Sequence, residues 1–336
     1  MKNFSVEFME HLCFPVWNTS CSPLSHLNYI NILLFLYISV MSVLTVCGNL
    51  LVIISIVIFK QLHTPTNLII LSLAVSDFLV GICVMPVESF RSINFCFRMK
   101  RVQCQIFHYI MSILGSASLI NILFVAIDRY FAVCNPLQYI SKMTIRRTLV
   151  CISLGWIVSI FYNLMIVDFG STQSGVTVVC LRECAVPVSE ARGGVDLIIS
   201  FISPFTAMII MYVRILTVAF RQAKAISNIE KENVSKKNQK SSRKSEMKAT
   251  KTLGSVVSLY IICWIPFFIT SLNMKYFQNS SVSFPALLCL FYTNSCINPF
   301  IYAVSYPWFK RSMKLVLTLE ILQTANKQFN LFSDNH

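Results

Sequence analysis

The sequence predicts an all-α membrane protein: a seven-transmembrane helix bundle with a short amphipathic eighth helix. Three observations predict this fold. The 336 residues are 55% hydrophobic and only 12% charged, about half the charged fraction of a soluble domain. Seven apolar runs are long enough to cross a bilayer, which takes about 20 residues in a helix. Lys and Arg gather in the segments between alternate runs, as they do in cytoplasmic loops.

Each spanning helix follows from its own run of apolar residues. The runs are residues 30–59, 66–90, 102–134, 146–168, 190–220, 248–274 and 283–305. Several are longer than a bilayer requires, which predicts tilted helices or extensions into water. The chain then divides into an extracellular N-terminus (1–29), the seven-transmembrane bundle (30–305), and an amphipathic helix with a cytoplasmic tail (306–336).

The eighth helix is predicted over residues 308–317, where Lys310, Arg311 and Lys314 interrupt aromatic and apolar positions. Such a pattern suits a helix that lies on the inner leaflet of the membrane.

The distribution of basic residues predicts the orientation. Residues 221–251 contain ten Lys or Arg against three Glu, which places this loop in the cytosol and the N-terminus outside. Four basic residues fall on the outer side (Arg91, Arg98, Lys100 and Arg101), too few to reverse this assignment. The net charge of +14 therefore indicates contact with anionic lipid rather than nucleic acid. We expect a multi-pass protein of the plasma membrane.

Six cysteines fall on the predicted outer face, which is oxidising. The sequence alone does not fix their connectivity. We expect a Cys104–Cys184 disulfide, because Cys104 opens the third span and Cys184 lies in the loop that folds over the helix mouth. A second bridge would join Cys180 to Cys13 or Cys21. N-glycosylation sequons on the same face begin at Asn3, Asn18 and Asn279.

Motifs within the spans narrow the class of membrane protein. In chain order they are Gly48-Asn49, Leu73 to Asp77, Asp128-Arg129-Tyr130, Trp156, Pro204 with Tyr212, Cys263-Trp264-Ile265-Pro266, and Asn298 to Tyr302. Together they resemble the rhodopsin-like G-protein-coupled receptors across all seven helices. The stretch from Asn294 to Phe309 resembles, more narrowly, the seventh-helix fingerprint of trace amine-associated receptors. This resemblance implies an olfactory receptor for volatile amines, which couples to a stimulatory G protein and raises cyclic AMP.

The predicted amine site departs from the broader amine-receptor pattern. Those receptors usually carry an ammonium-binding Asp in helix 3, where this chain has Met111. A carboxylate occurs instead in the fifth span, at Asp196, where the resemblance to a branch known mainly from fish implies a relocated counter-ion. Uniform helical spacing would place Asp196, Ser200 and Pro204 on one face. The expected ligand-binding residues are Asp196, Met111, Ser112, Gly115, Ser200, Trp264, Phe267, Phe268 and Tyr292.

Other roles for the acidic residues stay open at this level. Asp196 could instead form an internal salt bridge with Arg192, one helical turn away. Glu88 and Glu190 are candidate second acids for a diamine, although Arg91 could neutralise Glu88.

Asp77 is a second carboxylate inside a span. Resemblance to similar receptors implies an allosteric Na⁺ there that favours the inactive state; the alternative is a water-filled polar network. No other cofactor is expected. The candidate oxygen ligands are Asp77, Ser118, Asn294, Ser295 and Asn298.

The resemblance also implies a G-protein switch at the cytoplasmic end of the third span. Arg129 would be held by a partner at Glu246 in the inactive state and released when helix 6 swings outward. Tyr260 stands where similar receptors usually carry Phe. The residues expected to take part are Asp128, Arg129, Tyr130, Glu246, Tyr212 and Tyr302.

Competing functions fit the residues less well. A retinal protein needs a Lys in the last span, and residues 283–305 contain none. A transporter would be expected to show internal repeats or further charges in the membrane, and no nucleophile or metal cluster indicates an enzyme. The remaining alternative is a receptor of the same class for a non-amine small ligand.

Overall fold

The computed structural model describes residues 29–93, 101–173, 190–230, 254, 257–266, 283–305 and 307–318. All regular structure in these ranges is helical. Five of the helices are long and apolar enough to cross a membrane: Tyr29–Ile58, Pro65–Ser92, Val102–Cys134, Ile145–Met165 and Gly194–Arg221. The sixth predicted span is represented by the shorter apolar helix Val257–Pro266 and the seventh by α12 (Ser283–Ser305). The predicted fold class is confirmed.

The helices lie close to their predicted positions. The first four spans correspond to α2 (Tyr29–Ile58), α3 (Pro65–Leu79) continued by the π-helical η2 (Val80–Val84) and α4 (Met85–Ile93), α5 (Arg101–Cys134), and α7 (Ile145–Gln173). The fifth consists of α8 (Glu190–Leu197), the π-helical η3 (Ile198–Ile202) and α9 (Ser203–Glu230). Two short helices that the hydropathy pattern did not indicate are η1 (Lys60–Leu62) and α6 (Pro136–Lys142). The amphipathic helix is α13 (Pro307–Leu317).

The start of α3 illustrates how the sequence fixes a helix end. Thr64 has extended backbone angles, and its side chain accepts a hydrogen bond from the backbone N–H of Asn67. Pro65 then occupies the first turn, where its missing N–H removes no helical hydrogen bond. The tight turn after α2 therefore begins the second span at a defined residue.

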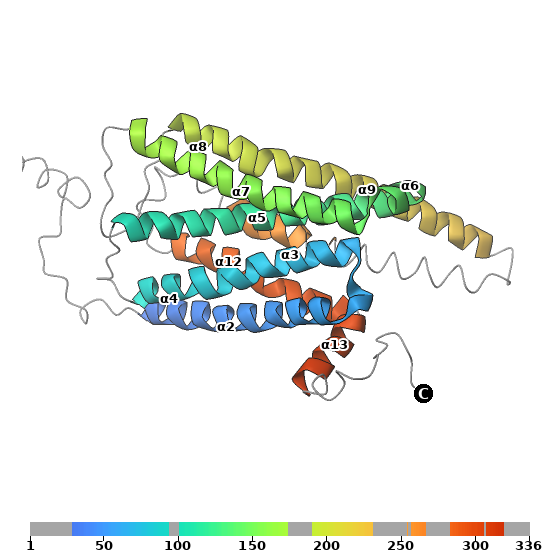
Figure 1. Cartoon of the computed structure of the whole chain (residues 1–336), viewed down its shortest axis with the longest axis horizontal. Helices are drawn as coiled ribbons and strands as arrows, with labels where there is room; N and C mark the ends of the chain where they lie inside the picture. The colour runs from blue at the N-terminus through green and yellow to red at the C-terminus, as the bar shows by residue number, and fades with distance from the viewer. Residues whose placement is uncertain are drawn as a thin grey trace, which may run out of the picture.

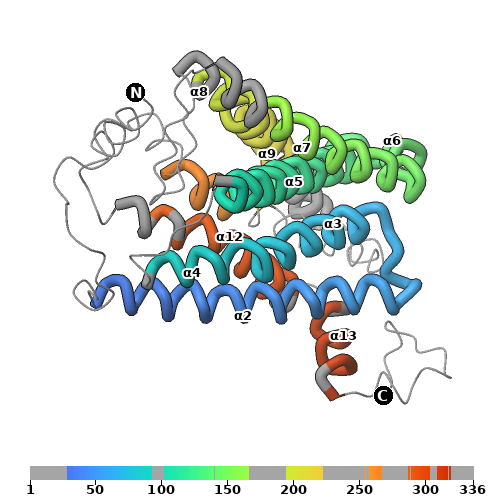
Figure 2. Tube along the Cα trace, turned by 60° about the vertical axis from the view of Figure 1, so that its left-hand side comes forward, coloured from blue at the N-terminus to red at the C-terminus, as the bar shows by residue number. Residues whose placement is uncertain are grey.

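Helix α5 runs through the middle of the bundle. It contacts α3 on one side and α7 and α9 on the other, and α2 closes the far side against α3, α4 and α12. Figures 1 and 2 show this order, with α13 lying across the end of the bundle beyond α2. Because α5 contacts both groups of helices, side chains on its surface can connect them.

A glycine allows α5 and α7 to approach closely. A Cβ atom on Gly155 would lie 2.8 Å from the Ile120 side chain and 3.2 Å from the Phe124 ring. Such a contact would push the helices apart, so a larger residue at 155 would disturb the position of the rest of α7.

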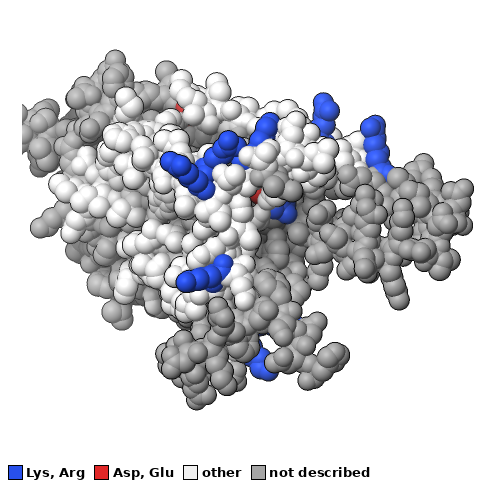
Figure 3. All heavy atoms as spheres, turned by 45° about the vertical axis from the view of Figure 1, so that its right-hand side comes forward, with Lys and Arg blue, Asp and Glu red and all other residues white. Residues whose placement is uncertain are grey.

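Exposed basic side chains mark one end of the bundle. Figure 3 shows Lys and Arg gathered on the end where α6, the start of α7 and α13 lie. The residues concerned include Lys142, Arg146, Arg147, Lys310, Arg311 and Lys314, all of which are exposed. This asymmetry is what the positive-inside rule describes for a cytoplasmic face.

Candidate ligand-binding site

The carboxylate of Asp196 is held by two hydroxyl groups where α7 meets α8. Tyr162 of α7 donates a hydrogen bond to Asp196 Oδ1 at 2.7 Å, and Ser200 of η3 donates to the same oxygen at 2.7 Å. The Ser200 hydroxyl is also 3.1 Å from the Tyr162 oxygen. All three side chains are half-buried. They form a compact group, which we call the hydroxyl–carboxylate cluster.

No cation pairs with Asp196 among the residues that the structure describes. The ion pairs found there are Glu88 with Arg91 and Asp128 with Arg129. The side chain of Arg192, the alternative partner, lies outside the described residues. Within the described part of the chain, Asp196 is therefore a carboxylate with neutral partners in a membrane-spanning segment.

The prediction that uniform helical spacing holds from Asp196 to Pro204 was wrong. The predicted proximity of Asp196 and Ser200 is nevertheless present. Uniform α-helical spacing would put Asp196 and Pro204 on one face, but the π-helical η3 lies between them. The backbone N–H of Ser203 donates to the carbonyl of Ile198, five residues back. One extra residue in the turn rotates the two ends of the span relative to each other by roughly 100°.

A row of aromatic rings leads from η3 into the bundle. Phe201, which follows Ser200, lies 4.3 Å from Phe205 between ring centroids, and Phe205 lies 5.8 Å from Tyr260. Tyr260 stacks on Trp264 at 5.4 Å. The row continues through Phe291, 4.8 Å from Trp264, to Tyr292 on α12, a further 5.5 Å away.

Several predicted pocket residues lie along this row. Gly115 of α5 faces Trp264, since a Cβ there would lie 3.6 Å from the indole ring. Met111 packs against the core cluster that contains Phe291 and Tyr292. Ser112 is half-buried. Phe267 and Phe268 lie outside the described residues.

Glu88 is neutralised within its own helix. Its carboxylate accepts a hydrogen bond from Arg91 at 2.7 Å, and the pair is largely buried at the end of α4. This arrangement weakens the case for Glu88 as a second amine-binding acid. The side chain of Glu190 is not described.

The five residues predicted to hold Na⁺ are all buried where α3, α5 and α12 meet. Asn298 donates to Asp77 Oδ2 at 2.8 Å, whereas Asp77 Oδ1 is buried without a hydrogen-bond partner among the described residues. A buried carboxylate oxygen without a donor favours a cation. The residues therefore fit a hard monovalent cation, with the side-chain oxygens of Ser118, Asn294 and Ser295 as further ligands.

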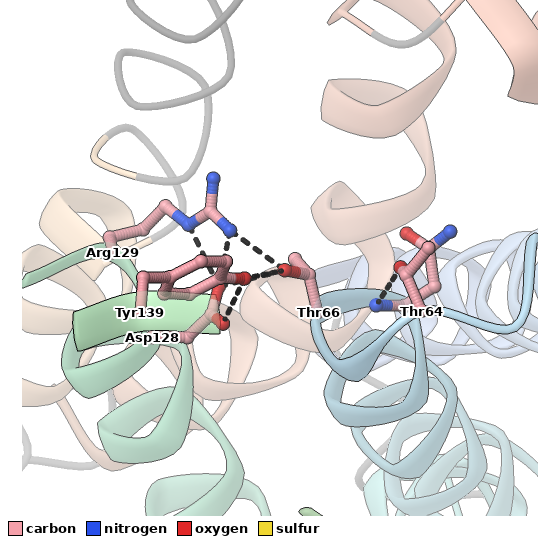
Figure 4. Close-up of polar contacts among 6 residues, drawn as sticks. Thr64, Thr66, Asp128, Arg129 and Tyr139 are labelled. Atoms are coloured by element: carbon pink, nitrogen blue, oxygen red, sulfur yellow. Dashed lines mark hydrogen bonds and ion pairs between the residues drawn. The ribbon is translucent and has the colours of Figure 1, made fainter. Parts of the chain in front are cut away.

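Arg129 is held at the end of α5 by a hydrogen-bonded group shown in Figure 4. Its guanidinium pairs with Asp128 and donates to the Thr66 hydroxyl at 2.7 Å. Thr66 donates to Asp128 at 2.9 Å, and Tyr139 of α6 donates to the other carboxylate oxygen at 3.0 Å. The arginine is thus occupied by its neighbours in this conformation.

Tyr139 remains a proton donor in this group. Burial, with the Asp128 carboxylate beside it, raises the pKa of the Tyr139 phenol. Since ionisation would set a phenolate beside the carboxylate, the neutral form that donates to Asp128 is favoured at ordinary pH.

The remaining described switch residues lie on three different helices: Tyr130 on α5, Tyr212 on α9 and Tyr302 on α12. Tyr302 is buried, and the Tyr212 ring is close to Gly254, where a Cβ would approach it to 3.2 Å. Tyr130 meets Phe131 edge to face. Glu246 lies outside the described residues, so its pairing with Arg129 stays a prediction.

The sequence reasoning missed three residues of these sites: Tyr162, Thr66 and Tyr139. Each is a hydroxyl-bearing side chain that reaches a carboxylate on another helix. The available signal was a tyrosine within an apolar span, at 162, and a polar residue next to a helix start, at 66.

The predicted disulfides and glycans fall largely outside the described residues. Cys104 forms a disulfide, and the seven other described cysteines are free thiols. Its partner is therefore outside the described ranges, and the pairing with Cys184 stays a prediction, as do the second bridge and the glycans at Asn3, Asn18 and Asn279.

Comparison with known proteins identifies the family. Residues 48–302 match the model of the 7 transmembrane receptor (rhodopsin family). The chain is 37% identical over 331 residues to trace amine-associated receptor 13c of Danio rerio, covering 96% of both chains. It is 35% identical to trace amine-associated receptor 8a of Rattus norvegicus and 36% identical to trace amine-associated receptor 6 of Pan troglodytes, each over 99% of both chains. The protein is thus a multi-pass membrane receptor and not an enzyme, and it belongs to the trace amine-associated receptors of the rhodopsin family.

Proposed function

We propose that this receptor senses amines through Asp196. The observation that carries the proposal is the hydroxyl–carboxylate cluster: a carboxylate in a spanning helix, bound by Tyr162 and Ser200 and paired with no cation in the described part of the chain. Asp, Glu, Lys and Arg inside membrane spans are rare and usually meet a partner or a ligand. A protonated amine is the missing positive charge.

The electrostatic gain is large enough to anchor a small ligand. A carboxylate and an ammonium about 4 Å apart attract by roughly 4 kcal/mol at an effective dielectric constant of about 20. Met111 offers no such attraction in α5, so the charge of the site comes from Asp196.

The relatives support the same ligand class, since they are named as trace amine-associated receptors. We infer an olfactory receptor in the plasma membrane, with its N-terminus outside and the basic end of the bundle in the cytosol. Agonist binding would release Arg129 to a stimulatory G protein and raise cyclic AMP.

The same receptor would bind Na⁺ at Asp77. The orphaned Asp77 Oδ1 supports this proposal, and Ser118, Asn294, Ser295 and Asn298 would complete the oxygen shell. The ion would favour the conformation in which Arg129 is held.

The direct test is a panel of primary, tertiary and poly-amines and neutral odorants on cells with a cyclic AMP reporter. We expect amines to activate the receptor, and Asp196→Asn to lower their potency by at least about a hundredfold, because losing one partner of a buried ion pair costs about 3–5 kcal/mol.

Glu88→Gln is the matched control, since Glu88 already pairs with Arg91; we expect it to shift amine potency much less than Asp196→Asn does. Activation by neutral odorants alone, or an unchanged amine response in Asp196→Asn, would reject the proposal in favour of a non-amine ligand.

A further inference from the structure

We propose that the Asp196 site selects primary ammonium groups over their N-methylated counterparts, and that Tyr162 and Ser200 set this preference. The inference rests on the proposed function, because it takes Asp196 as the residue that binds the amine. The inference further specifies how many N–H donors the ammonium group of the ligand must present.

The hydrogen bonds of the cluster all end on one carboxylate oxygen. Tyr162 and Ser200 both donate to Asp196 Oδ1, each at 2.7 Å. Asp196 Oδ2 has no hydrogen-bond partner among the described residues. The two hydroxyls therefore fix the orientation of the carboxylate and leave its second oxygen open.

The cluster can accept hydrogen bonds but has none left to donate. A serine or tyrosine hydroxyl carries a single proton, and both protons are directed at Oδ1. The 3.1 Å contact from Ser200 to Tyr162 uses the same serine proton. What remains are lone pairs on Asp196 Oδ2, Ser200 Oγ and Tyr162 Oη.

The polar residue next in sequence supplies no donor either. Asn163 follows Tyr162, but its amide donates to the Ser116 hydroxyl on α5 at 2.9 Å and to the Ser159 carbonyl at 2.7 Å. Phe201, which follows Ser200 in the sequence, begins the aromatic row, which suits the hydrocarbon part of a ligand.

A group of three acceptor oxygens around a negative charge matches a primary ammonium, which has three N–H donors. Each N-methyl group removes one donor and sets a methyl against an acceptor, which is then buried without a partner. A quaternary ammonium keeps the charge and donates nothing. Potency should therefore fall along the series from primary to quaternary amine.

The experiment measures this series in cyclic AMP dose–response curves. The probes are phenethylamine and hexylamine, each with its N-methyl, N,N-dimethyl and N,N,N-trimethyl derivatives. In the unmodified receptor we expect potency to fall about threefold to tenfold per methyl group, the value of one hydrogen bond.

Two variants test the assigned residues. Tyr162→Phe and Ser200→Ala each remove one acceptor, so the ratio of primary to dimethyl potency should fall by about threefold or more in each. A ratio measured in the same cells is insensitive to differences in surface expression and G-protein coupling.

Two controls separate this role from a general loss of structure. Ser200→Thr keeps the hydroxyl and should keep the ratio. Tyr37→Phe removes a phenol that bonds Thr293 at 2.6 Å between α2 and α12, far from the cluster in the fold, and should also leave the ratio unchanged.

The outcomes distinguish the two proposals. A flat series or a preference for tertiary amines overturns the inference, as does an unchanged ratio in both Tyr162→Phe and Ser200→Ala, while amine sensing at Asp196 stands. If no amine of the full panel activates the receptor, or if Asp196→Asn responds as strongly as the unmodified receptor, the proposed function itself fails. If other amines of the panel activate it and neither primary probe does, only the inference is overturned.

Discussion

At the scale of single residues, the hydroxyl of Tyr260 is one of several buried polar groups in the switch region that have no hydrogen-bond partner among the described residues. The side chain is fully buried between Phe205 and Trp264. Its hydroxyl has no hydrogen-bond partner among the described residues. A buried hydroxyl without a partner destabilises a structure by about 1–3 kcal/mol. In the proposed switch, a held Arg129 marks the resting state, so the unpaired hydroxyl would disfavour that state.

We therefore expect Tyr260→Phe to lower ligand-free activity. Phenylalanine keeps the stacking on Trp264 and removes only the unpaired hydroxyl. If the substitution stabilises the resting state by about 1 kcal/mol, the population of the active state falls about fivefold. The measurement is basal cyclic AMP at matched surface expression.

Tyr37→Phe is the control for this substitution, because the Tyr37 hydroxyl is already paired with Thr293 and its loss relieves no unpaired group. Basal activity that rises or stays constant in Tyr260→Phe would show that the hydroxyl finds its partner in the resting state.

The residue scale also shows what sequence could and could not supply. Asp196 and Ser200 are four residues apart in one continuous helical segment, so their contact could be predicted from helical spacing. Tyr162 could not be found that way, because its contact with Asp196 depends on how α7 is rotated against α8. The same holds for Tyr139, whose helix α6 had no hydropathy signal.

At the scale of elements, hydropathy located the helices well but gave no sign of the π-helical segments. Each of these is followed by a proline: Pro86 after η2 and Pro204 after η3. A proline inside a helix loses one hydrogen bond and clashes with the carbonyl four residues back, which is Ile82 or Ser200. A wider turn before the proline relieves that clash, so the two prolines were the available signal.

Pro204→Ala should therefore weaken the amine response without changing any charge. An alanine permits regular α-helix through η3, which would rotate Asp196 away from Tyr162 by roughly 100°. We expect amine potency to fall at least about tenfold, as the alignment of the open oxygen is lost. Dose–response curves with the amine panel measure it.

Pro86→Ala makes the same change at η2, away from the hydroxyl–carboxylate cluster, and serves as its comparison. Equal shifts in the two variants would mean that the effect is a general one of helix geometry rather than of Asp196 placement.

At the scale of the whole molecule, Asp77 lies where α3, α5 and α12 meet, between the aromatic row above and the Arg129 group at the basic end. The overall arrangement could be predicted, because seven apolar runs and ordered motifs leave few alternatives. The sequence could not predict whether an ion occupies such a junction, since the same buried oxygens suit Na⁺ or water.

Sodium bound at this junction should change agonist affinity at the ligand site indirectly, by favouring one receptor conformation. Replacing sodium by potassium at constant ionic strength should raise agonist affinity several-fold, since an ion that binds one conformation better shifts the population toward it. Asp77→Asn should remove the effect. Competition binding on membranes measures both; insensitivity to sodium in the unmodified receptor would reject the ion.

The free thiols have a practical consequence for labelling. Cys47, Cys83 and Cys151 are exposed on helix surfaces, whereas Cys263 and Cys296 are buried. The first three lie on the surfaces of membrane-spanning helices and would therefore face lipid, where a thiol ionises poorly and reacts slowly with a maleimide. In the intact membrane, a dye or spin probe should therefore label an engineered cysteine in a loop in preference to these three.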